Sequence, residues 1–132
     1  MGKLAFMYES NLNSLCDAIR QCSFELHSYL KHGHLEKVYE NGLAHRLNKL
    51  GYSSEQQVPL SVFDEDGFLL GDFYADLLVE DQIIVELKAC RSVSEEHVSQ
   101  LLGYLRSSRK RVGLLINFGA PRIHVKRYLL DT

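Results

Sequence analysis

Three ionisable side chains stand close together in the middle of the chain, surrounded by apolar residues. They are Asp76, Glu86 and Lys88. Two apolar, strand-prone runs around the short polar segment 80–82 predict a β-hairpin. Because side chains alternate across a strand, Glu86 and Lys88 point the same way, and a turn centred near Asp81 sets Asp76 opposite Glu86. The sequence therefore predicts two carboxylates and an ammonium on one face of a largely buried sheet.

Burying these charges requires a compensating partner, because each buried ion costs several kcal/mol unless it is paired or metal-bound. Facing carboxylates suit Mg²⁺ or Mn²⁺, with the backbone carbonyl of Leu87 as a further oxygen ligand. A metal-activated water is a nucleophile for phosphodiesters, and Lys88 is placed to position it or to stabilise the transition state. Two simpler interpretations remain open. Asp76 and Glu86 are solvent-exposed carboxylates on an edge strand, or Lys88 forms a salt bridge with one of them.

The composition is that of an ordinary globular chain of 132 residues, with a formal net charge of −2 and three cysteines. We expect one domain over residues 1–132. No apolar run approaches the about 20 residues that span a bilayer, and the N-terminus lacks the pattern of a secretory signal, so we expect a cytoplasmic protein with reduced thiols. A sequence pI of about 6.3 argues against a dedicated nucleic-acid binder, but not against an enzyme that meets nucleic acid at a local site.

The elements that position these residues are predicted from apolar periodicity and from turn residues. Ser10 or Asn11 is expected to cap the first helix, Gly51 to end the second, and Ser94 to cap the third. We predict helices over 11–30, 35–50 and 95–107, and strands over 57–63, 68–79, 82–89, 112–117 and 123–130. A helix between two strands favours a parallel pair. The fold class is therefore α/β (α+β), a mixed sheet flanked by helices in the order ααβββαββ.

An Asp on one strand and Glu-x-Lys on the next resemble the PD-(D/E)xK nuclease superfamily, which has a restriction-endonuclease-like core. Gly33-x-x-Glu36-x-x-Tyr39 is similar to the signature of the small GxxExxY family, and segments 76–80, 86–89, 97–105 and 113–121 resemble its later blocks, in the same order. The resemblance implies a nuclease that uses Mg²⁺ or Mn²⁺ to hydrolyse DNA or RNA. Ala75 departs from the family, because a basic residue often stands there.

The resemblance also implies roles for residues outside the central hairpin. Glu36 matches an acidic residue that completes the metal site, although a first-turn glutamate also suits the helix dipole. Gln100 and Tyr104 share one helix face with His97 and match a motif that contacts phosphate or the attacking water. That stripe is alternatively the solvent side of the helix. Arg106 begins a basic cluster that is either a substrate contact or a solvated surface.

Two kinds of function follow from these patterns. The first is a metal-dependent nuclease with Asp76, Glu86, Lys88 and Gln100 as catalytic residues, with nucleic acid as the partner. The second is a catalytically silent binding or assembly module, or a subunit that needs a partner. A homodimer through strand or helix edges is compatible with either function. Tyr39 is interpreted as a core residue, and segment 117–121 as a strand-to-turn junction.

Overall fold

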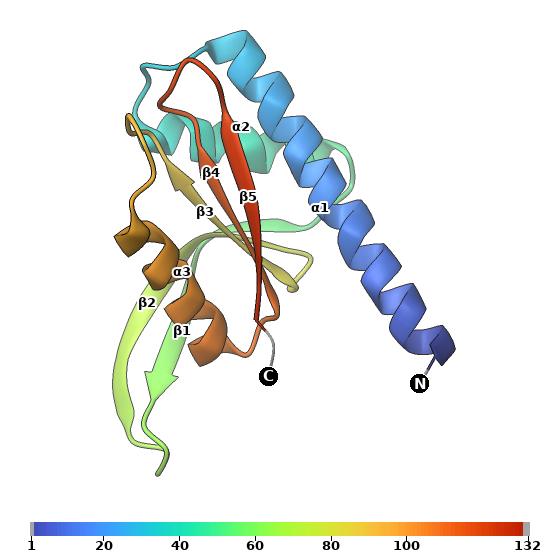
Figure 1. The fold of residues 1–132 in the computed structure, drawn as a ribbon, viewed down its shortest axis with the longest axis vertical. Coiled ribbons are helices and arrows are strands. Elements are labelled where there is room, and N and C mark those ends of the chain that lie inside the picture. The colour runs from blue at the N-terminus through green and yellow to red at the C-terminus, as the bar shows by residue number, and fades with distance from the viewer. Residues whose placement is uncertain (1, 131–132) are drawn as a thin grey trace.

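The computed structural model describes residues 2–130, and it describes side chains from residue 8 onward. The helices are α1 (Gly2–Leu30), α2 (Glu36–Lys49) and α3 (Glu95–Ser108). The strands are β1 (Ser54–Phe63), β2 (Leu69–Val79), β3 (Ile83–Lys88), β4 (Val112–Asn117) and β5 (His124–Leu129). The order ααβββαββ is thus confirmed (Figure 1).

All five strands form one sheet in the spatial order β1-β2-β3-β4-β5. Neighbouring strands are antiparallel except for β3 and β4, which are parallel and joined by α3. A parallel pair needs a crossover long enough to return to the start of the sheet, and α3 provides it. The predicted mixed sheet is confirmed.

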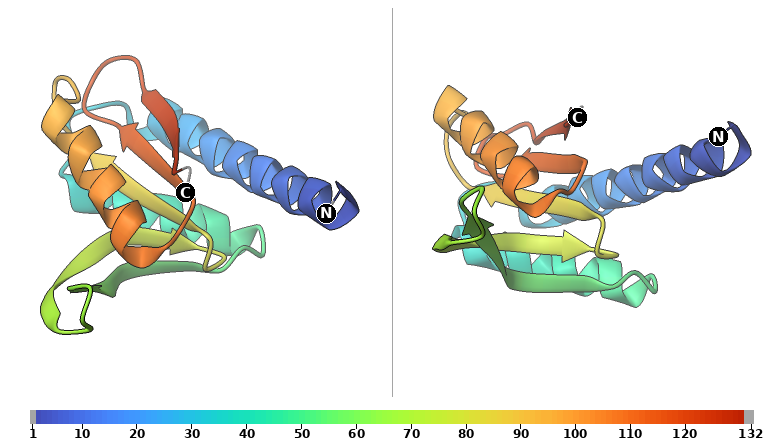
Figure 2. Two further views of the ribbon diagram at one scale, coloured as in Figure 1. Left: turned by 60° about the horizontal axis from the view of Figure 1, so that its bottom comes forward. Right: turned by 90° about the horizontal axis from the view of Figure 1, so that it is seen from below.

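The helices cover both faces of the sheet, so its inner strands are apolar on both sides (Figure 2). One hydrophobic cluster joins α1 and α2 to residues such as Leu77, Val85 and Ile116. A second cluster joins Leu101 and Leu105 of α3 to the opposite face. Because side chains alternate along a strand, consecutive residues of β3 and β4 enter different clusters.

The first helix is longer than predicted. It begins at Gly2, so Ser10 and Asn11 lie inside α1, and the prediction that either residue caps it is wrong. The residues between Gly2 and Ser10 are mostly good helix formers, with no proline to stop the helix, and a cap-type residue inside such a run does not end it. Strand β1 also begins three residues early, passing through Gln57 in a left-handed conformation (φ 52°).

The predicted helix ends are otherwise confirmed. After α2, Gly51 adopts φ 94°, and the Tyr52 amide donates to the Leu47 carbonyl at 3.1 Å. This is a Schellman ending, which favours glycine. At α3, the Ser94 hydroxyl accepts the His97 amide (3.3 Å) while His97 Nδ1 accepts the Ser94 amide (3.2 Å), so the two residues form a capping box.

Tyr39 is a core residue, as interpreted from the sequence. It is fully buried and stacks on Phe118 with ring centroids 4.7 Å apart. Its hydroxyl donates to the Lys31 carbonyl at 2.6 Å and accepts the His34 amide at 3.2 Å. The tyrosine therefore ties the loop before α2 to the core.

Replacing Tyr39 with Phe is expected to lower the free energy of unfolding by about 0.5–1.5 kcal/mol, because the Lys31 carbonyl and the His34 amide lose their hydrogen-bond partner. Urea unfolding measures the change. Tyr29→Phe is the matched control, since Tyr29 is 77% exposed. Equal losses in the two variants would contradict a structural role for the Tyr39 hydroxyl.

Candidate active site

Asp76 and Glu86 meet where β2 and β3 stop pairing. The ladder between these strands ends at Leu77↔Val85, and Asp76 and Glu86 occupy the next positions. There Asp76 Oδ2 accepts the Leu87 amide at 2.9 Å, and the Asp76 amide donates to Glu86 Oε1 at 3.4 Å. At this fork, the point where β2 and β3 separate, side-chain hydrogen bonds thus replace backbone pairing. The predicted opposition of the two acids is confirmed.

Glu86 is a buried acid, with 6% of its surface exposed. Burial, and after it the nearby carboxylate of Asp76, raise its pKa to about 9, while Lys88 acts in the opposite direction. Both simpler interpretations therefore fail for this site. Glu86 is not exposed, and among residues 8–130 Lys88 forms no salt bridge with either acid.

Glu36, the first residue of α2, lies within electrostatic range of this pair. The residue as a whole is exposed, but its carboxyl end is partly desolvated, and this desolvation raises its pKa. Asp76 raises the pKa as well, whereas Lys88 and the backbone amide of Ala89 lower it. The residue implied by the family signature is thus close enough to Asp76 for the two charges to interact.

Only part of the predicted stripe on α3 faces the acids. Tyr104 stacks on Phe73, with ring centroids 3.8 Å apart, and burial and the charges of Glu86 and Asp76 raise its pKa. Gln100 is exposed and has no hydrogen-bond partner among the described side chains. His97 serves the capping box described above, so it has a structural role irrespective of substrate contact.

Arg106 lies apart from the acid pair. It lines a cavity of about 740 Å³ between the C-terminal end of α3 and the β1–β2 hairpin, together with Ser61, Asp64 and Arg109. None of Asp76, Glu86 and Lys88 lines this cavity. A direct contact of Arg106 with the reacting group therefore gains no support from its position.

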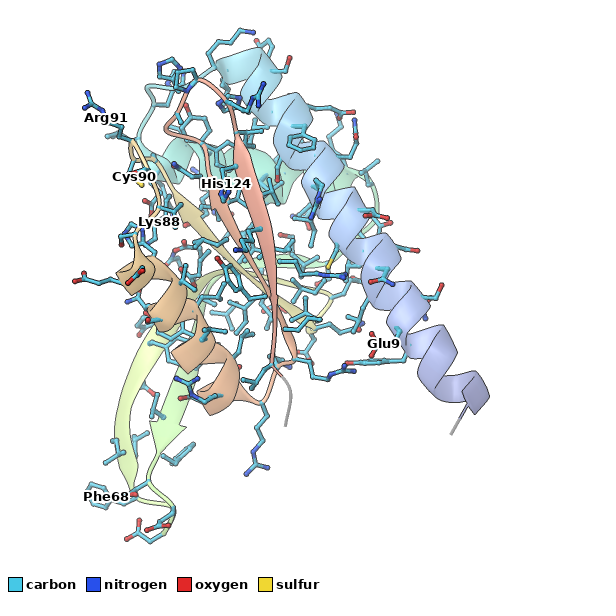
Figure 3. The ribbon with its side chains drawn as sticks, in the orientation of Figure 1. Glu9, Phe68, Lys88, Cys90, Arg91 and His124 are labelled. Carbon is cyan, nitrogen blue, oxygen red and sulfur yellow. The ribbon has the colours of Figure 1, made fainter. Side chains whose placement is uncertain are left out.

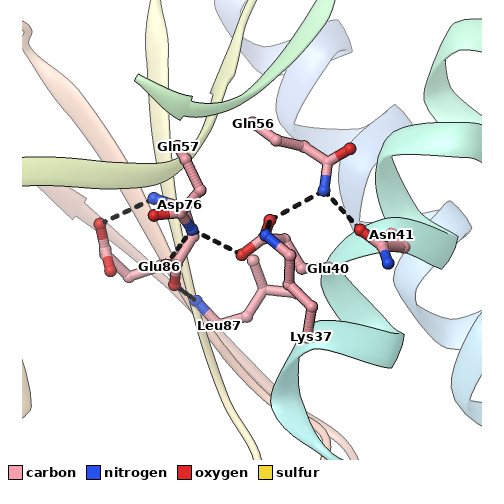
Figure 4. A network of polar contacts seen from close by, with 8 residues as sticks. All are labelled: Lys37, Glu40, Asn41, Gln56, Gln57, Asp76, Glu86 and Leu87. Atoms are coloured by element: carbon pink, nitrogen blue, oxygen red, sulfur yellow. Dashed lines mark hydrogen bonds and ion pairs between the residues drawn. The ribbon is translucent and has the colours of Figure 1, made fainter. Parts of the chain in front are cut away.

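Sequence reasoning missed the network that supports Asp76 (Figure 4). The side-chain amide of Gln57 donates to Asp76 Oδ1 at 3.3 Å and to Glu40 Oε1 at 2.8 Å. Glu40 is buried and also accepts from Lys37 at 2.7 Å. A signal for Glu40 was present, because it falls on the apolar stripe of its helix, three residues before Leu43. Gln57 gave no such signal, since its role depends on its left-handed backbone conformation within β1.

The segment that follows Lys88 is clamped by Asn117 at the end of β4. Asn117 Oδ1 accepts the amides of Cys90 (3.1 Å) and Gly119 (3.0 Å), and its Nδ2 donates to the Cys90 carbonyl (2.9 Å). Segment 117–121 is a strand-to-turn junction, as interpreted from the sequence. The structure adds that this junction fixes the backbone two residues beyond Lys88.

The donors at the fork fit a divalent cation. Across residues 8–130, no three His, Cys, Asp or Glu side chains gather as a metal site, so the protein would offer two carboxylates and a backbone oxygen. The Lys88 carbonyl accepts the Phe118 amide at 2.8 Å, toward β4. Polar groups alternate sides along a strand, so the Leu87 carbonyl points toward β2 and the fork, like its amide. Oxygen donors of this kind suit Mg²⁺, which retains several waters.

Comparisons with known proteins agree with this geometry. The family model described as the PD-(D/E)XK nuclease superfamily matches residues 13–128, and the chain belongs to that superfamily. A solved structure titled "Crystal structure of SSO0001" is similar in fold, with a TM-score of 0.56 and 22% identity over 73% of this chain. The match covers 52% of that solved chain, so this chain spans about half its length. No curated protein matched the sequence.

Cys16, Cys22 and Cys90 are all free, and the first two are buried on α1. None of the helices within residues 2–130 combines the length and the apolar character that crossing a membrane requires.

Proposed function

We propose that this protein is a divalent-cation-dependent nuclease that hydrolyses phosphodiester bonds of DNA or RNA, with Mg²⁺ or Mn²⁺ at Asp76 and Glu86. One observation carries the proposal. Glu86 is buried against a second carboxylate, with no salt bridge from any described side chain, and its pKa of about 9 expresses the cost of charging it. A cation between the two acids would offset that cost.

The chain's own residues would divide the work. Asp76 is oriented by the Leu87 amide and by Gln57, so its carboxylate is fixed before any ligand binds. A bound ion would lower the pKa of water and neutralise negative charge on the phosphate. The Lys88 ammonium would stabilise negative charge that develops in the transition state, and the Tyr104 hydroxyl would donate a hydrogen bond to a phosphate oxygen. Glu36 would add a further oxygen ligand, directly or through water. Gln100 is exposed on α3, and its proposed role is to contact the reacting group from there.

Several finer assignments belong to the same proposal. The Gly33-x-x-Glu36-x-x-Tyr39 signature supports a place in the GxxExxY family within the superfamily. A cytoplasmic location, a single domain and a homodimer stay predictions.

Replacing Lys88 with Ala is expected to lower the rate of cleavage about 100-fold or more, because the transition state loses its ammonium. Cleavage of single- and double-stranded DNA and RNA is measured with Mg²⁺ and with Mn²⁺. Lys49→Ala is the matched control, since Lys49 is an exposed lysine at the far end of α2. Equal cleavage by the wild type, Asp76→Ala and Lys88→Ala would identify a contaminating nuclease and overturn the proposal.

Calorimetry with Mn²⁺ separates the remaining alternatives. Binding to the wild type but not to Asp76→Ala, without cleavage, favours a nuclease subunit that needs a partner. The absence of Mn²⁺ binding to the wild type favours a silent binding or assembly module.

A further inference from the structure

We propose that Arg91 and His124 form a phosphate-binding subsite beside Lys88, which holds a backbone phosphate of the nucleic acid close to the scissile one. This inference rests on the proposed function. It assigns a direction along which the substrate leaves the acid pair, toward β5.

The register of the sheet places His124 in line with Lys88. Lys88 on β3 pairs with Asn117 on β4, and Asn117 pairs with His124 on β5. Ile123 and Val125 pack against the cluster under α1 and α2, so His124 between them lies on the opposite face, which carries Glu86 and Lys88. Adjacent strands are about 4.8 Å apart, so the backbones of Lys88 and His124 are separated by about 10 Å. That distance is about three nucleotide rises along one strand of a duplex.

A cavity of about 320 Å³ lies at this position. Its lining residues are Arg91, Ser92, Val93, Asn117, Ala120 and His124, none of which is acidic. Figure 3 shows Lys88, Arg91 and His124 toward the same end of the molecule, with Arg91 on the segment that follows β3. A guanidinium, an imidazole and a hydroxyl offer the donors that nucleic-acid phosphates accept from proteins.

The donors of this cavity are available, and its walls are held in place. Within residues 8–130, neither Arg91 nor His124 forms a hydrogen bond or an ion pair through its side chain, and both are exposed. The Asn117 side chain holds the Cys90 backbone on both its amide and its carbonyl, so the residue before Arg91 is fixed. A phosphate would therefore meet a preformed pocket and free cationic or donor groups.

A further basic side chain follows His124 on the same face of β5. Lys126 stands two residues on, with its ammonium 5.3 Å from the centre of the Tyr128 ring. In the sheet, Leu115 on β4 pairs with Glu86 on one side and with Lys126 on the other. The acids nearest to Arg91 along the chain are Glu95 and Glu96 in the first turn of α3 and Glu86 on β3, and none of them lines the cavity. Charge along this path thus favours a polyanion on a protein whose net charge is −2.

Binding measured without cleavage tests the subsite. Short labelled single-stranded DNA and RNA are titrated with the protein in EDTA at several salt concentrations, with fluorescence anisotropy as the readout. Arg91→Ala and His124→Ala are each expected to weaken binding about tenfold, the equivalent of one charge-assisted hydrogen bond. Arg91→Ala should also reduce the slope of log K against log salt by about 0.7, because the variant neutralises one phosphate fewer on a single strand.

The controls separate this inference from the proposed function. Lys49→Ala, which removes the same charge on the other side of the sheet, should bind as the wild type does, and Arg91→Lys should recover part of the affinity. In a cleavage assay with Mg²⁺, Arg91→Ala should raise KM and leave kcat nearly unchanged. Unchanged affinity and salt slope in both alanine variants, or no binding by the wild type at low salt, would overturn the subsite. If the wild type cleaves nonetheless, the nuclease proposal survives. If binding depends on Arg91 and His124 but no metal supports cleavage, the subsite survives and the nuclease proposal does not.

Discussion

Replacing Glu86 with Gln is expected to abolish cleavage and, at the same time, to stabilise the metal-free protein at neutral and alkaline pH. Burial and Asp76 raise the pKa of Glu86 to about 9, well above the ordinary value of 4.5. Between these two values the folded protein holds a proton that the unfolded chain releases. The stability that this proton contributes is complete below about pH 4.5 and is lost as the pH rises toward 9. A pKa difference of this size corresponds to a loss in the free energy of unfolding on the order of 6 kcal/mol.

The prediction is checked by urea unfolding in EDTA from pH 5 to pH 9. The free energy of unfolding of the wild type should fall steeply over this range, and that of Glu86→Gln should fall much less. Glu55→Gln serves as the control, because Glu55 is an exposed acid on β1. Added Mn²⁺ should stabilise the wild type at pH 8 and leave Glu86→Gln unchanged, since the amide cannot supply a negative charge. Parallel pH profiles for the wild type and Glu86→Gln would show that Glu86 is not the group responsible.

Replacing Gly119 with Ala is expected to be severely destabilising. A Cβ atom at this position would lie 2.2 Å from the Cys90 nitrogen and 2.4 Å from the Ala89 carbonyl carbon. These are backbone atoms, so relief requires a shift of the segment that follows Lys88. Overpacking against flexible side chains costs about 1–3 kcal/mol, and we expect about 3 kcal/mol or more against the backbone. Any variant that still folds should also lose cleavage, because Lys88 moves with this segment.

Gly103→Ala on α3 is the matched control. Nothing lies within 4 Å of its added Cβ atom, and its φ is not in the left-handed region. Alanine in the middle of a helix is favoured over glycine by about 0.5–1 kcal/mol, so this variant should be slightly more stable than the wild type. Thermal unfolding of the two variants and the wild type measures both effects. If Gly119→Ala unfolded at the temperature of the wild type, the close approach of the two backbone segments would be refuted.

The conflict between stability and activity at Glu86 follows from its place in the fold. The acid belongs to a strand that is apolar on both faces, and its neighbours Ile84, Val85 and Leu87 are fully buried. A leucine or glutamine would suit such a position better in the absence of a ligand. Lys88, two residues on, is only half-buried and can face solvent or substrate. A charged residue in an apolar environment, with no partner in the fold to offset its burial, is expected mainly at functional sites.

Much of this molecule was predictable from short stretches of sequence. Alternation along two strands and a polar turn between them sufficed to set Asp76 opposite Glu86. Helical periodicity, the Ser94 cap and Gly51 located α2 and α3, and the helix before residues 112–117 implied the parallel pair. Each of these features depends on the pattern of residues within one helix, one hairpin or one helical connection, where backbone geometry and propensity decide the outcome.

The tertiary structure alone decided which side chains support the site and which merely lie near it. Gln57 bridges Glu40 and Asp76, and Asn117 clamps Cys90, across separations of 17 to 27 residues. Of the stripe on α3, Tyr104 faces the acids, whereas Gln100 is exposed and His97 caps its own helix. Such contacts depend on how strands and helices that are distant in the sequence pack in space, and local periodicity carries no information about that packing. The paired acids could therefore be predicted from the sequence, whereas the groups that hold them in place are brought together only when the sheet and helices pack.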